Sequence, residues 1–113
     1  MHELALTEKL FGLVLREAEA HKAGKVLKVK MVIGELSGIV EDSVELYFKL
    51  LSKNTIAEEA RLEFQRTKAN LFCIQCDKEF IKRSQDFCCH VCGNLGRLTK
   101  SGHECYVESI EVE

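Results

Sequence analysis

The sequence contains no proline, so its turns and helix caps depend on other residues. Seven glycines in 113 residues give the backbone conformational freedom, and Asn, Asp and Ser share the remaining turn positions. No apolar run approaches the ~18 residues of a membrane-spanning helix, and the first residues lack the basic and apolar stretches of a secretory signal. We therefore expect a cytoplasmic protein without membrane association.

The sequence also lacks a strong excess of either charge. It has 16 basic and 18 acidic residues, which give a net charge of −2. Nucleic-acid-binding domains usually carry a basic patch, so we expect no nucleic-acid partner. Because 46% of the residues are hydrophobic and 30% are charged, the chain is typical of a folded globular protein. Its length suits one domain, or one small domain with a subdomain.

Common catalytic signatures are missing as well. The sequence holds no Gly-rich phosphate-binding loop and no G-x-S-x-G nucleophile motif. It also lacks the H-x-E pattern of the zinc deaminases. We therefore expect that the protein is not an enzyme.

The spacing of apolar residues predicts two helices and three strands. Steps of three and four residues indicate helices over residues 4–22 and 42–54. Asp42 with Glu45 resembles a capping box at the start of the second helix. Alternation of apolar and polar residues predicts strands at residues 26–34 and 60–67, and a last strand at the C-terminus, where Ile110 and Val112 alternate with glutamates. The expected fold is α+β, with two helices packed on a three-stranded, mainly antiparallel sheet.

Four of the six cysteines form two C-x-x-C pairs. Two intervening residues let the chain turn so that both thiolates face one ion, and two such turns supply the four sulfurs that suit tetrahedral Zn²⁺. A closed set of four protein ligands leaves no open position for substrate, so we expect a structural site. The predicted zinc ligands are Cys73, Cys76, Cys89 and Cys92.

The residues near the second pair leave the ligand set partly open. Cys88 is an alternative to Cys89, but Cys89 reproduces the spacing of the first pair, which makes Cys88 a spare thiol. His90 lies inside the second pair, and we interpret it as a solvated loop residue. Cys105 is interpreted as a small side chain of the last strand.

The cysteine-containing segment has few large apolar residues. A segment of this size cannot form a sufficient hydrophobic core alone and usually needs an additional cross-link, such as a structural metal ion. We therefore expect a four-cysteine zinc subdomain over residues 69–101. It would be inserted into an α/β body made of residues 1–68 and 102–113.

The first three residues, Met1, His2 and Glu3, bring three potential metal donors together next to the first predicted helix. A free amine, a deprotonated backbone amide and an imidazole can form fused chelate rings. Such nitrogen-rich, planar donor sets select Ni(II) or Cu(II) over tetrahedral zinc. Because His2 is bulky, we expect Met1 to be retained with its amine. The alternative is a solvated chain end with an incidental histidine.

Several stretches together resemble the HypA family of nickel metallochaperones, which serve in the maturation of nickel–iron hydrogenases. They are "MHE" at the start, "IGELSGIVEDSVELYF", the pairs "CIQC" and "CHVC", and the ending "SIEVE". The resemblance implies nickel as a transient cargo held with Met1, His2 and Glu3, and structural zinc on the four cysteines. It also implies delivery to the hydrogenase large subunit together with a maturation GTPase. One departure is His90, where the family often has proline.

Three other kinds of protein share parts of this pattern. A zinc-ribbon adaptor or nucleic-acid-binding module would use the same cysteines, but here basic residues are balanced by acidic ones without aromatic interleaving. A rubredoxin-like electron carrier would hold iron on four thiolates. A thioredoxin-like role for the first pair would leave the second pair unexplained. We expect a nickel carrier that is a monomer or a weak homodimer.

Overall fold

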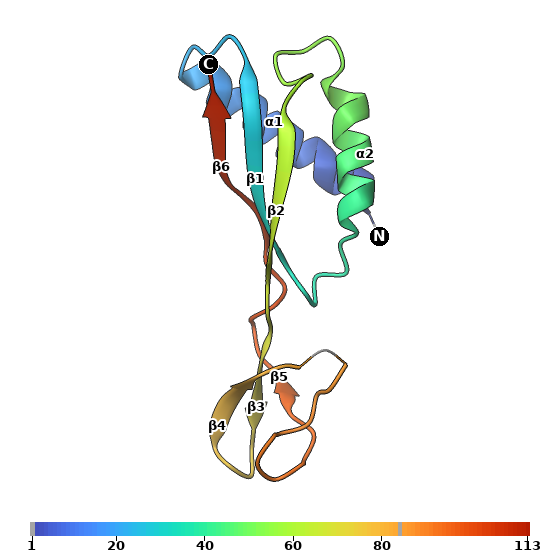
Figure 1. Ribbon diagram of the computed structural model, residues 1–113, viewed down its shortest axis with the longest axis vertical. Coiled ribbons are helices and arrows are strands. Elements are labelled where there is room, and N and C mark those ends of the chain that lie inside the picture. The colour runs from blue at the N-terminus through green and yellow to red at the C-terminus, as the bar shows by residue number, and fades with distance from the viewer. Residues whose placement is uncertain (1, 84) are drawn as a thin grey trace.

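The computed structural model describes residues 2–83 and 85–113 and shows an elongated molecule (Figure 1). Its principal extents are 55 × 25 × 17 Å. Helices α1 (Glu3–Ala20) and α2 (Glu41–Ser52) lie at one end with a three-stranded sheet, and a second three-stranded sheet lies at the other end. Neither helix in the described chain is long and apolar enough to cross a membrane.

In the larger sheet, β1 (Val26–Gly34) lies between β2 (Arg61–Thr67) and β6 (Cys105–Val112). Strand β1 pairs antiparallel with β6, as expected, but it pairs parallel with β2. The reason is that α2 carries the chain from the end of β1 back to the start of β2, which is the crossover that a parallel pair requires. Because three of the four pairings between named strands are antiparallel, the predicted α+β fold with mainly antiparallel pairing is confirmed.

The core lies between the two helices and the larger sheet. Val29 and Met31 of β1 are buried against Val14 of α1 and Phe48 of α2. The rings of Phe11 and Phe48 join the two helices edge to face, with centroids 5.5 Å apart, a favourable aromatic geometry. The helical and two-residue periodicities of the sequence therefore correspond to one shared apolar interior.

Helix α2 begins one residue before the predicted capping box. Its N-cap is Val40, whose side chain makes no capping bond, and Asp42 lies inside the first turn, so the prediction of a capping box is wrong. In a capping box, a carboxylate of the same helix accepts a hydrogen bond from the N-cap N–H. Here the carboxylate comes from another helix, because the Val40 N–H donates to Glu3 Oε2 of α1 at 3.1 Å.

In the smaller sheet, β3 (Asn70–Cys73) lies between β4 (Lys78–Ile81) and β5 (Arg97–Leu98), and both pairings are antiparallel. Two chain segments join this sheet to the larger one (Figure 1). At that junction, the Ala69 N–H donates to Glu35 Oε1 at 2.7 Å. The backbones of Gly34 and Gly102 approach so closely that a Cβ at Gly34 would collide with the Gly102 carbonyl.

Candidate metal sites

The four cysteines of the C-x-x-C pairs meet at the end of the smaller sheet. Their Sγ atoms all lie within 4.8 Å of one another. The distance is 3.5 Å between Cys73 and Cys92, and 3.9 Å between Cys76 and Cys89. A tetrahedral zinc ion with Zn–S bonds of ~2.3 Å requires sulfur–sulfur distances of about 3.8 Å. The four sulfurs therefore fit a single zinc ion with little movement.

Each cysteine pair lies in a turn whose backbone N–H groups point toward sulfur. The Cys76 N–H donates to Cys73 Sγ, and the Val91 N–H donates to Cys89 Sγ, both at 3.4 Å. Gly93 follows the second pair with a φ of 79°, a left-handed conformation that glycine adopts at little steric cost. The short turns thus place both thiols of a pair on one side.

The predicted nickel donor His2 is the N-cap of α1, with φ 62° and ψ 22°. Left-handed backbone is uncommon outside glycine, although histidine is among the enriched residue types, and such strain is often found at functional sites. The exposed side chain makes no capping bond, whereas the His2 carbonyl accepts the Leu6 N–H at 3.0 Å. The His2 imidazole is therefore accessible to solvent at the start of α1. The predicted donor Met1 lies outside the described residues.

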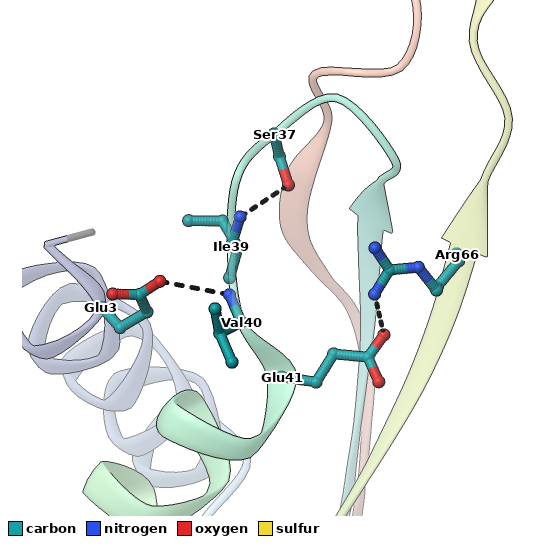
Figure 2. A network of polar contacts seen from close by, with 6 residues as sticks. All are labelled: Glu3, Ser37, Ile39, Val40, Glu41 and Arg66. Atoms are coloured by element: carbon teal, nitrogen blue, oxygen red, sulfur yellow. Dashed lines mark hydrogen bonds and ion pairs between the residues drawn. The ribbon is translucent and has the colours of Figure 1, made fainter. Parts of the chain in front are cut away.

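Glu3 is buried, with 9% of its surface exposed. Figure 2 shows its carboxylate directed at the Val40 N–H, beside the ion pair of Glu41 with Arg66 at 2.6 Å. A carboxylate at a helix N-terminus is favourable because the helix dipole is positive there. Glu3 thus joins the start of α1 to the start of α2, and a direct bond from its Oε2 to a metal would compete with this contact.

The comparisons with known proteins agree on one family. Residues 1–112 match the family model described as "Hydrogenase/urease nickel incorporation, metallochaperone, hypA". The chain belongs to the HypA family. The hydrogenase maturation factor HypA of Caldanaerobacter subterraneus subsp. tengcongensis is 48% identical, with both chains covered in full. That of Dehalococcoides mccartyi strain ATCC BAA-2266 is 40% identical, covering 100% of this chain and 95% of the relative.

A solved structure shows the same similarity. The solution structure of the Ni metallochaperone HypA from Helicobacter pylori matches with a TM-score of 0.67 and 25% identity, covering 99% of this chain and 97% of that one. The HypA resemblance predicted from the sequence motifs is therefore confirmed over nearly the whole chain. A nickel metallochaperone role in hydrogenase maturation follows from this membership.

Within this chain, the thiols of the cysteine cluster differ in acidity. The backbone N–H groups of Cys92 and Val91 lower the pKa of the Cys89 thiol to about 6. Desolvation, followed by the neighbouring thiols, raises the pKa of Cys76 to about 12. Near neutral pH the cluster therefore keeps part of its protons, and these would be displaced when the sulfurs bind a divalent cation.

The other two cysteines, Cys88 and Cys105, lie outside the cluster. The Cys88 N–H donates to Asp86 Oδ1 at 2.9 Å, and Cys88 pairs with Leu95 in an isolated bridge. Cys105 lies in β6 against the core, where burial raises the pKa of its thiol. The structure thus brings Cys89, rather than Cys88, to the other three sulfurs. Sequence spacing was a sufficient signal for this choice.

Proposed function

We propose that this HypA-family chain binds Ni(II) at its N-terminus through Met1, His2 and Glu3, and delivers it during maturation of nickel–iron hydrogenase. The observation that carries the proposal is the exposed His2 imidazole at the left-handed start of α1, in a chain that matches a nickel-incorporation family. The amine, the backbone amide and the imidazole form the nitrogen-rich set that Ni(II) favours over tetrahedral geometry.

The position of this site also suits release of the cargo. A cation at a helix N-terminus faces the positive end of the helix dipole, which weakens binding relative to the same donors in a free peptide. The Glu3 carboxylate nearby partly offsets this repulsion. Glu3 Oε2 accepts a hydrogen bond from the Val40 N–H. We therefore propose that the Glu3 side chain holds the site in place, and that Glu3 contributes to metal binding through its backbone.

We further propose that Cys73, Cys76, Cys89 and Cys92 hold a structural zinc ion. The support is the compact set of four sulfurs, which leaves no ligand position open for a substrate. The zinc ion then organises a subdomain of residues 69–101, joined to a nickel-binding body of residues 1–68 and 102–113. The hydrogen bond from the Ala69 N–H to Glu35 lies at the proposed boundary.

The proposed working context is protein-to-protein transfer of nickel in the cytoplasm, without catalysis. Family membership places the chain in hydrogenase maturation. The maturation GTPase and the hydrogenase large subunit are the partners that the family resemblance implies. We propose that the carrier meets them as a monomer or a weak homodimer.

The test of the nickel site is a titration of tag-free protein that keeps its native N-terminus. His2→Ala should abolish stoichiometric nickel binding and leave zinc content and the helical circular dichroism unchanged. His21→Ala is the matched control, since His21 is an exposed residue at the opposite end of the same helix. Equal nickel affinity of the His2→Ala variant and the parent protein would refute the proposed site.

A further inference from the structure

His90 lies between the two cysteines of the second pair and reaches out of its own loop. Its Nε2 lies 3.2 Å from the carbonyl oxygen of Ile81. Its ring meets the Phe80 ring edge to face, with centroids 5.2 Å apart and an interplanar angle of 78°. One side chain therefore makes both a polar and an aromatic contact with β4, although its surface is largely exposed.

The strand that His90 contacts belongs to the hairpin that carries the first pair. Phe80 of β4 pairs with Leu71 of β3, and β3 ends at Cys73. By contrast, the backbone bonds from the Cys89 N–H to Asn94 and from the Gly96 N–H to Phe87, both 2.8 Å long, close the second loop on itself. The contacts of His90 thus connect two segments whose sulfurs must share one ion.

We propose that His90 is a positioning residue for the zinc site, which holds the second cysteine pair against β4 so that its sulfurs face those of the first pair. This inference rests on the proposed zinc function. A backbone carbonyl can only accept a hydrogen bond, so the contact requires a hydrogen on Nε2. The N–H donor and the aromatic ring of one imidazole together fix both the distance and the tilt of the loop.

Loss of this contact should change how fast the metal leaves rather than whether it binds. Four thiolates remain in a His90 variant, so zinc stoichiometry is retained. Because one exposed hydrogen bond and one edge-to-face contact are each modest, we expect zinc transfer to a chelator to become about 5- to 10-fold faster. The loop would separate more often from the hairpin, exposing the second pair to the competing ligand.

The experiment measures zinc transfer from the full-length protein to 4-(2-pyridylazo)resorcinol. His90→Ala removes both contacts, His90→Phe keeps an aromatic ring without the donor, and His90→Gln keeps a donor without the ring. The expected order of rates places His90→Ala fastest, with the other two variants between it and the parent. His103→Ala is the control, because His103 is an exposed histidine outside the smaller sheet and outside the four-cysteine cluster, and it should match the parent.

A second measurement reports geometry directly. In Co(II)-substituted protein, His90→Ala should keep the charge-transfer bands of four thiolates but alter the visible d–d bands, and His90→Gln should partly restore them. Parent-like rates and spectra in His90→Ala would overturn the positioning role while leaving the zinc site intact. A parent protein that binds no stoichiometric zinc would instead overturn the zinc proposal and this inference with it.

Discussion

Removal of two cysteines should unfold the proposed zinc subdomain while the body stays folded. The perturbation is the double variant Cys73→Ala, Cys76→Ala, which takes away half of the sulfurs that lie within 4.8 Å of one another. Metal binding at such a site is folding free energy, since the ligands are not assembled in the unfolded chain. The variant therefore tests whether the smaller sheet has any other sufficient source of stability.

The structure indicates that the smaller sheet has little stability from sources other than the metal. Leu71 is fully buried, but Ile74, Val91 and Leu95 remain 54%, 73% and 74% exposed. Full burial of one leucine contributes about 1.5–3 kcal/mol, whereas a structural zinc ion contributes about 10–16 kcal/mol of apparent binding free energy. Zinc binding thus stabilises this segment more than apolar burial does, and without the ion residues 69–101 should lose their order.

The assay combines metal analysis with amide hydrogen exchange. The double variant should hold no zinc and should exchange rapidly over residues 69–101, while β1 and α2 keep parent-like protection because their core lies elsewhere. Cys105→Ala is a control that removes a cysteine outside the cluster. Retention of one equivalent of zinc by the double variant, or protection that survives zinc loss, would refute the reasoning.

Three further predictions concern single residues. Cys88→Ser should keep zinc and Cys89→Ser should lose it, as measured by metal analysis, because the cluster includes the sulfur of Cys89 and not that of Cys88. The reverse result would contradict this assignment. Gly34→Ala should destabilise the protein in urea by about 1–3 kcal/mol, because its Cβ collides with the Gly102 carbonyl; an unchanged midpoint would argue against this close approach. The backbone N–H of Glu104, together with the Thr67 hydroxyl, lowers the pKa of the Glu104 carboxyl below 4.5. Its stabilising contribution is therefore complete above pH ~4.5 and lost as the pH falls through the folded-state pKa. Urea titrations below pH 4.5 should show a smaller pH dependence in Glu104→Gln.

Local sequence patterns predicted much of the fold and the cysteine cluster. The periodicity that predicted helices over residues 4–22 and 42–54 depends on residues near in sequence, so it can be recognised without tertiary information. The choice of Cys89 over Cys88 likewise followed from spacing alone. The metal-binding segment was recognisable because its chemistry resides in closely spaced residues of one type.

Features that depend on distant partners could not be predicted. The N-cap of α2 is Val40, and its partner Glu3 lies 37 residues earlier in the chain, so no local capping pattern marks the start of this helix. The parallel pairing of β1 with β2 depends on where α2 packs. The contacts of His90 arise only once β4 has folded beside its loop.

The measurement that tests the central claim most directly is nickel binding as a function of the N-terminus itself. Calorimetric titration should compare tag-free protein with a variant that carries two additional residues before Met1. We predict that the native chain binds one nickel ion and that the extension strongly weakens binding, because it removes the free amine from its place beside the His2 imidazole. Zinc content should be equal in both. Nickel binding by the extended chain at the affinity of the native chain would contradict the account.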